Sequence, residues 1–155
     1  MGITVDDFLK SYKNIAFDTN VFIAVFAQEP LGAKVLPIID AVGNKETHEI
    51  WTSVLAFSEC SVRPYREANR TALDQIKLMF QMPNLTAYPI DAAIAEEAAK
   101  IRANYNFKMP DALIAATAIV MGADVLLTND HKLSTIREIP VVRLDELDVT
   151  GDGFL

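Results

Sequence analysis

The stretch IAFDTNVFIAVFA, residues 15–27, joins two apolar segments through a single acid, Asp18. Its first three residues predict a short strand, and the apolar pattern resumes at Val21 as a helix that runs to about Ala27. Asp, Thr and Asn all cap helices well, so Asp18 has a local explanation as a helix cap. It also has a chemical explanation, because an acid that ends a buried strand can belong to a functional site.

The same alternation of strand and helix continues along the chain. Further short apolar strands are expected at 50–52, 85–88, 125–127 and 141–144. Helices are expected at 4–12, 31–42 with a kink or break at Pro37, 53 to beyond 59, 66–81, 91–106 and 110–121. This order predicts an α/β fold, with a mostly parallel sheet of about five strands between two layers of helices. Ligands of such sheets bind beyond the carboxyl ends of the strands.

Composition narrows the class of protein. With 155 residues, 51% of them hydrophobic, we expect a single domain spanning residues 1–155 with a substantial core. No apolar run approaches the roughly 20 residues that a membrane helix needs, and acids stand where a signal peptide would be basic. We therefore expect a soluble, cytoplasmic protein. One cysteine and two histidines exclude a disulfide within the chain and argue against most zinc sites.

The net charge of −7 argues against a broad surface that binds nucleic acid passively. A nucleic acid substrate is compatible with this charge only if something local offsets it. A bound divalent metal ion would do so.

Four acids fall where this fold would place a site: Asp18, Glu59, Asp111 and Asp130. Asp18 and Asp130 end strands, Asp111 lies in the first turn of an apolar helix, and Glu59 interrupts an apolar helix. Each has an ordinary alternative, since the aspartates could cap helices or turns or favour a helix N-terminus, and Glu59 could pair with Arg63 one turn later. Taken together, their positions favour a shared site.

Clustered carboxylates cannot all stay ionised in a dry pocket without compensation. Oxygen ligands without histidine or thiolate indicate Mg²⁺ or Mn²⁺. One or two such ions can activate a water, and two ions about 3.5–4 Å apart can also stabilise the leaving oxygen of a phosphodiester.

The segments DTN at 18–20, PDALIAATA at 110–118 and LLTND at 126–130, together with Glu59, resemble a PIN domain. The likeness is to the VapC-type ribonuclease toxins of toxin–antitoxin systems and spans residues 14–144. It implies a three-layer sandwich and a metal-dependent endoribonuclease, a hydrolase of RNA phosphodiesters that binds magnesium or manganese. It carries over Asp18, Glu59, Asp111 and Asp130 as catalytic and metal-binding acids, and Asn20 and Thr128 as supporting residues.

The same resemblance implies a homodimer and a small antitoxin with a basic C-terminal segment. We expect an arginine or lysine of that segment to face the four carboxylates, beside a groove along helices 21–27 and 53–62. Four apolar residues could line that groove, form the dimer interface or belong to the core: Val21, Phe22, Val25 and Phe26. We expect residues 1–13, an extension before the first strand, to serve another interface or to cover the core, and residues 150–155 to form a flexible tail.

Some interpretations stay open. Arg63, Arg102 and Lys108 could contact RNA phosphates or simply be surface charges. The whole chain could be a PIN-like interaction module without catalysis, although such a module could lose the four acids freely. A receiver domain or a dehalogenase-type phosphatase fits less well, because both need a second acid near Asp18 that DTN does not supply.

Overall fold

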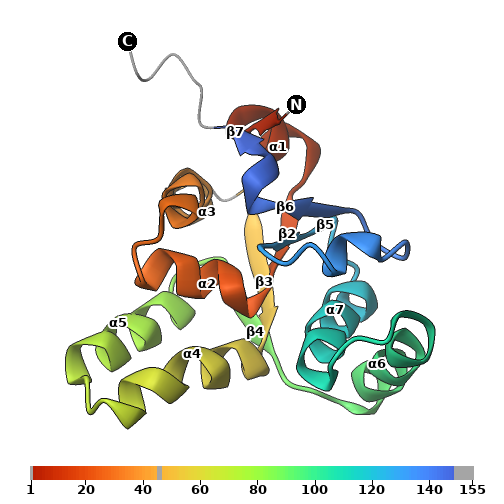
Figure 1. The fold of residues 1–155 in the computed structure, drawn as a ribbon. Coiled ribbons are helices and arrows are strands. Elements are labelled where there is room, and N and C mark those ends of the chain that lie inside the picture. Colours follow the sequence, from red (N-terminus) through yellow and green to blue (C-terminus); the bar gives the residue numbers. More distant parts are fainter. Residues whose placement is uncertain (1, 45–46, 149–155) are drawn as a thin grey trace.

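Five parallel strands lie side by side at the centre of the computed structural model, which describes residues 2–44 and 47–148 (Figure 1). Their order across the sheet is β4-β3-β2-β5-β6, which confirms the predicted parallel sheet. The strands are β2 (Asn14–Phe17), β3 (Glu49–Ser53), β4 (Leu85–Tyr88), β5 (Val125–Thr128) and β6 (Val141–Arg143). Since the chain adds β3 and β4 on one side of β2 and β5 and β6 on the other, the strand order reverses between β2 and β5. Such a reversal opens a crevice beyond the strand ends.

Helices cover both faces of this sheet. Figure 1 shows α2 to α5 on one side and α6 and α7 on the other, so the fold is a three-layer α/β/α sandwich, as predicted. The helices are α2 (Thr19–Phe26), α3 (Leu36–Asn44), α4 (Val54–Arg66), α5 (Arg70–Phe80), α6 (Ala92–Tyr105) and α7 (Met109–Met121). Short 3-10 helices are η1 (Pro30–Lys34), η2 (Leu133–Thr135) and η3 (Leu144–Glu146).

Polar residues begin the helices where the sequence predicted. The Ser53 hydroxyl accepts a hydrogen bond from the backbone N–H of Leu55 in α4, and Asp91 caps α6 in the same way. Gly122 ends α7 with φ of 76°, a left-handed conformation that glycine adopts without a steric penalty. Local capping chemistry therefore sets these helix boundaries.

The break predicted within the helix over 31–42 is confirmed, whereas the start predicted for the helix over 66–81 is wrong. The helix expected over 31–42 is divided into η1 and α3, and the break falls before Pro37, which is the second residue of α3. The helix expected over 66–81 begins only at Arg70, where the side chain of Asn69 caps it, while Arg66 is the last residue of α4. In the second case the capping residue, not the apolar spacing, decides where the helix starts.

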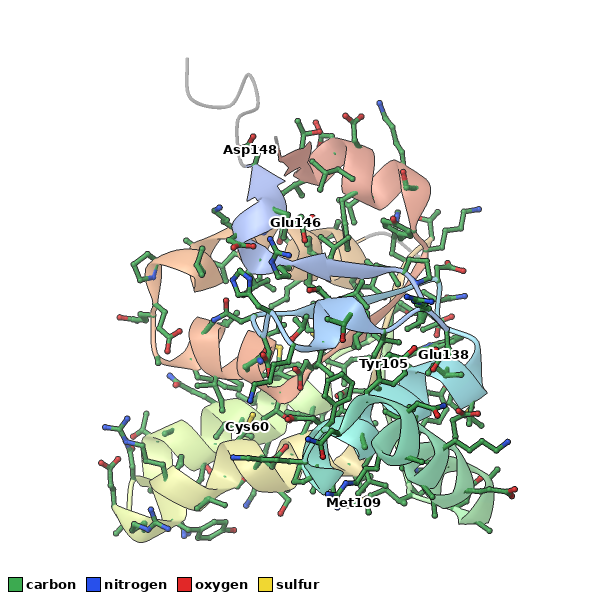
Figure 2. The ribbon with its side chains drawn as sticks, turned by 45° about the vertical axis from the view of Figure 1, so that its right-hand side comes forward. Cys60, Tyr105, Met109, Glu138, Glu146 and Asp148 are labelled. Carbon is green, nitrogen blue, oxygen red and sulfur yellow. The ribbon has the colours of Figure 1, made fainter. Side chains whose placement is uncertain are left out.

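The N-terminal extension covers the core at the amino ends of the strands. Strand β1 (Ile3–Thr4) pairs in parallel with β7 (Leu147–Asp148), and α1 (Val5–Ser11) follows it. Phe8 of α1 is fully buried. Figure 2 shows Glu146 and Asp148 at this end of the molecule, with Cys60 and Met109 toward the other. The predicted tail, 150–155, lies outside the described residues.

Aromatic side chains fill the layer between α2 and the sheet. Val21 and Phe22 are fully buried, and the Phe22 ring lies 5.3 Å from that of Phe17 and 4.8 Å from that of Phe80, measured between ring centroids. The idea that Val21 and Phe22 contribute to an apolar surface is therefore wrong.

Among the described residues no single helix could cross a membrane. The bent pair Thr19–Phe26 and Pro30–Asn44 is long and apolar enough to do so by length and composition alone.

Candidate functional site

Asp18 occupies the point where the strand order reverses. Its backbone N–H donates to the carbonyl of Leu127 in β5 (3.0 Å), which ties the end of β2 to its neighbour. Its Oδ1 accepts from the N–H of Thr19 (2.7 Å) and its Oδ2 from the hydroxyl of Thr128 (2.8 Å). The side chain is thus held in one orientation at the carboxyl edge of the sheet, where the sequence predicted it.

The environment of Asp18 disfavours its charge. Burial raises the pKa of this carboxyl from 3.8 to about 6, although the hydrogen bonds from Thr128 and Thr19 oppose the rise. The nearby charges of Asp111 and Glu59 raise it further. A carboxyl whose pKa is raised this strongly by burial and by neighbouring charges is typical of a functional site.

The turn after β5 places Asp130 next to Asp18. The Thr128 hydroxyl, which donates to Asp18, also accepts from the backbone N–H of Asp130 (3.0 Å). Asn20 accepts the N–H of Asn129 through its Oδ1 (2.9 Å). Thr128 and Asn20 therefore hold this turn against β2, which is consistent with the supporting roles expected for them.

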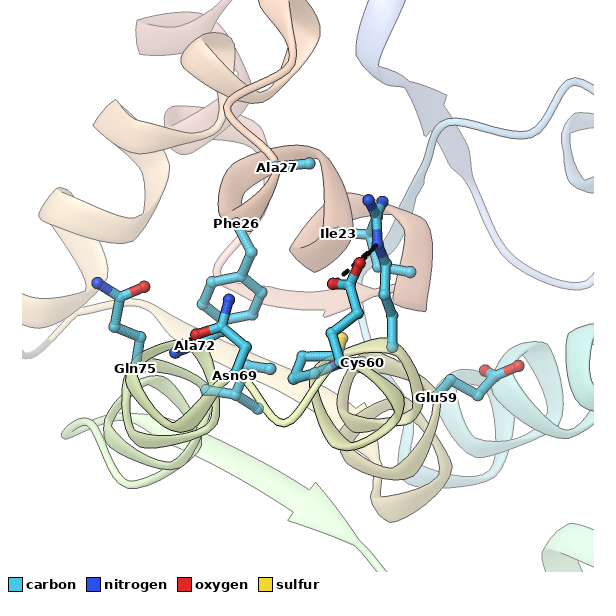
Figure 3. Close-up of a pocket in the computed structure, with 12 residues that line it drawn as sticks. Ile23, Phe26, Ala27, Glu59, Cys60, Asn69, Ala72 and Gln75 are labelled. Atoms are coloured by element: carbon cyan, nitrogen blue, oxygen red, sulfur yellow. Dashed lines mark hydrogen bonds and ion pairs between the residues drawn. The ribbon is translucent and has the colours of Figure 1, made fainter.

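Glu59 reaches the site from α4. Its Oε1 accepts a hydrogen bond from the hydroxyl of Thr19 (2.7 Å). The alternative ion pair of Glu59 with Arg63 is wrong, because Arg63 pairs with Glu67 instead, with 3.3 Å between Nε and Oε2. Figure 3 shows Glu59 directed away from Asn69 and toward α7.

Asp111 completes the group from the first turn of α7. Burial raises its pKa, and the charges of Asp130 and Glu59 add to the rise, while Lys108 and Lys132 lower it. The carboxylates of four separate elements thus act on one another electrostatically. They form a single acidic cluster beyond the carboxyl edge of the sheet.

The donor chemistry of this cluster suits Mg²⁺ or Mn²⁺, because every available side-chain ligand is a carboxylate or a hydroxyl. Within residues 2–44 and 47–148, however, no three His, Cys, Asp or Glu side chains already converge as a set of metal ligands in the metal-free arrangement. Hydrogen bonds engage both oxygens of Asp18 and one oxygen each of Glu59 and Asp130. Metal binding by the four acids stays a prediction.

Two residues of the site were missed by sequence reasoning. Thr19 was considered only as part of the DTN stretch, as a possible helix cap and within the family motif, and was given no role in the site, although it contacts two of the acids. Lys132 was not considered at all, yet its backbone N–H donates to Oδ1 of Asp130 (2.9 Å) and its charge acts on Asp111. A sequence signal existed for both, since each lies within two residues of a predicted acid.

The basic residues proposed for substrate binding differ in their surroundings. Arg63 is exposed and paired with Glu67, Arg102 is exposed on α6, and Lys108 is exposed immediately before α7. Only Lys108 among these three acts on an acid of the cluster. Asp124 lies at the opposite edge of the sheet, where it accepts the backbone N–H groups of residues 13 and 14.

A pocket of about 410 Å³ adjoins the cluster between α2, α4 and α5 (Figure 3). Its apolar lining includes Ile23, Phe26 and Ile76, and Glu59 lies on its wall. The buried Cys60 also lines it, and burial followed by the charge of Glu59 raises the pKa of this thiol to about 12, so the thiolate is disfavoured.

Comparisons with known proteins agree with this fold. The PIN domain model matches residues 15–139, which is most of the chain, so the chain belongs to the PIN domain family. No curated protein matches it.

Similar solved structures include VapBC2 from Rickettsia felis bound to a DNA fragment from its promoter, with a TM-score of 0.70 and 15% identity over 84% of this chain and 98% of that one. VapBC-1 from nontypeable Haemophilus influenzae has a TM-score of 0.68 and 17% identity over 85% and 98% of the two chains. A toxin–antitoxin complex from Klebsiella pneumoniae has a TM-score of 0.64 and 22% identity over 84% and 97%. The fold is that of a VapC-like PIN domain, as predicted.

Proposed function

We propose that this protein is a divalent-metal-dependent endoribonuclease that hydrolyses RNA phosphodiesters in the cytoplasm and is the toxin of a toxin–antitoxin pair. The observation that carries the proposal is the gathering of the acids around Asp18 and Asp111. The charges of Asp111 and Glu59 raise the pKa of Asp18, and the charges of Asp130 and Glu59 raise the pKa of Asp111. Protein interiors seldom gather four carboxylates without a cation to compensate them. Membership in the PIN domain family supports the same chemistry.

The four acids would hold one or two ions of Mg²⁺ or Mn²⁺, with Asp18 as the most buried ligand. A bound ion supplies an activated water and neutralises charge on the phosphate. The chain itself orients the ligands, since Thr128 fixes Asp18 and the backbone N–H of Lys132 fixes Asp130. Ligands restrained in this way lose little freedom when the ion binds.

Substrate phosphates would meet Lys108 and Lys132 first. Both side chains are exposed, and both act on Asp111 from the rim of the acidic cluster. Local cations matter in a protein of net charge −7, because the overall field repels RNA. Arg63 and Arg102 remain further candidates, with Arg63 having first to leave Glu67.

The partner would be a small antitoxin with a basic C-terminal segment. The structural neighbours that are toxin–antitoxin complexes support this partner, as does the pocket between α2, α4 and α5. An apolar segment in that pocket would bring an arginine close to Glu59, where its planar fork can bridge carboxylates. A homodimer is proposed on the family resemblance alone.

Cleavage by purified protein tests the central proposal. Loss of a hydrogen-bond partner of a metal ligand costs about 10- to 100-fold in activity. Asp111→Asn alters a proposed ligand itself, so it should reduce Mn²⁺-dependent RNA cleavage by more than this. Asp74→Asn is the matched control, because Asp74 is an exposed acid of α5. Equal cleavage by wild type and Asp111→Asn would refute the assignment. If the wild-type protein binds the small protein encoded by the adjacent gene but cleaves no RNA, the result would favour an interaction module without catalysis.

A further inference from the structure

Thr19 touches two acids that come from different elements. It is the first residue of α2, and its backbone N–H donates to Oδ1 of Asp18 (2.7 Å). Its hydroxyl donates to Oε1 of Glu59 (2.7 Å), forty residues further along the chain. Thr19 is only 6% exposed, so water competes little for either bond.

Glu59 depends on this contact for its orientation. Within residues 2–44 and 47–148, the Thr19 hydroxyl is the only hydrogen-bond donor to its carboxylate. A glutamate side chain has three rotatable bonds, and Glu59 is only partly buried, so packing alone does not select one rotamer. A hydrogen bond to a charged carboxylate is short and about twice as strong as a neutral one, which suffices to select one.

We propose that Thr19 is a positioning residue that holds the carboxylate of Glu59 in a fixed relation to that of Asp18. The inference rests on the proposed metal-dependent function and deepens it. Because Thr19 occupies Oε1, the other oxygen of Glu59 is left for a cation. Because the backbone N–H of the same residue donates to Oδ1 of Asp18, one residue sets the relative placement of two acids on separate elements.

Two substitutions of Thr19 separate the effect of its hydroxyl from that of its methyl group. Thr19→Val keeps the shape and removes the hydroxyl, whereas Thr19→Ser keeps the hydroxyl and removes a methyl group. Neither change affects the N–H that binds Asp18. Thr117→Val is the matched control, since Thr117 is also a buried helical threonine. Among the residues that the structure describes, its hydroxyl bonds only to the carbonyl of Leu113.

Metal affinity is the first measurement, by the rise in melting temperature during Mn²⁺ titration. Thr19→Val should need about 10-fold more Mn²⁺ for half of the maximal shift, the lower end of what such a partner contributes. Thr19→Ser should restore the wild-type value and Thr117→Val should not change it. In RNA cleavage, Thr19→Val should lower kcat by a larger factor than it raises KM. Unchanged Mn²⁺ dependence in Thr19→Val would overturn the positioning role.

A double-mutant cycle in chelator separates this inference from the proposed function. Glu59→Ala is used because glutamine could still accept the bond. If Thr19 and Glu59 are coupled, the change in melting temperature of the double variant should differ from the sum of the changes in the two single variants. Additive effects would overturn the Thr19–Glu59 link whatever the metal does. If the cycle shows coupling but Mn²⁺ does not raise the melting temperature of the wild type, the metal-dependent function is overturned instead. The role of Thr19 in that function is then overturned as well.

Discussion

Replacing Asp18 with asparagine should stabilise the metal-free protein at neutral pH, although the same change should abolish cleavage. The side chain is 3% exposed, and its burial raises its pKa from 3.8 to about 6. Because the native state binds this proton more tightly than the unfolded state, the ionised carboxylate lowers stability. The loss is absent below about pH 4, grows between about pH 4 and 6, and is complete above about pH 6.

The shift sets the size of the effect. Each pKa unit corresponds to about 1.4 kcal/mol, so ionised Asp18 lowers the free energy of unfolding by about 3 kcal/mol above its folded pKa. Asparagine can still accept the N–H of Thr19, but its amide replaces the oxygen that accepts from Thr128, which costs about 1 kcal/mol. The net gain of about 2 kcal/mol corresponds to a melting temperature about 4–8 °C higher for a chain of this length.

Thermal and urea unfolding in chelator, at about pH 7.5 and about pH 4.5, would measure this gain. The advantage of Asp18→Asn should largely vanish at the lower pH. Asp124→Asn is the control at the opposite edge of the sheet, where Oδ2 accepts two backbone N–H groups, so it should destabilise by up to about 1 kcal/mol. An Asp18→Asn variant no more stable than wild type at neutral pH, or equally stabilised at both pH values, would refute the reasoning.

Three further changes follow from single contacts. Thr128→Val leaves Oδ2 of Asp18 without its donor and should destabilise by about 1–3 kcal/mol in urea unfolding, with Thr128→Ser close to wild type. Gly32→Ala places a methyl 2.1 Å from a backbone carbonyl oxygen of α2 and should lose at least about 2 kcal/mol, whereas Gly43→Ala, whose nearest neighbour is a methionine methyl at 3.6 Å, should be neutral or stabilising in the same assay. Lys132→Gln should weaken RNA binding in chelator and lower the salt slope by a little under one unit, measured by fluorescence anisotropy; an unchanged slope would exclude a phosphate contact.

The order of strands and helices was predictable because it depends on short local patterns in the sequence. Short apolar runs such as Ile15–Phe17 end at acids or caps, and each is followed by a helical pattern, so the parallel sheet follows from chain order alone. The same logic placed Asp18 and Asp130 at the carboxyl edge, since a residue after a strand of a parallel sheet must lie there. Asp111 lies at the same edge for another reason, because it begins a helix that runs back to the amino end of β5. Local capping residues, such as Asn69, decided the boundaries that apolar spacing misjudged.

Contacts between distant residues were decided only by the tertiary structure. Sequence spacing allowed Arg63 as the partner of Glu59, but packing of α2 against α4 brings the Thr19 hydroxyl to that carboxylate. Likewise, Val21 and Phe22 look the same in sequence whether they face solvent or core, and only the position of the sheet buries them. Periodicity determines which residues share a face, whereas the partner of that face is set by how the elements pack in three dimensions.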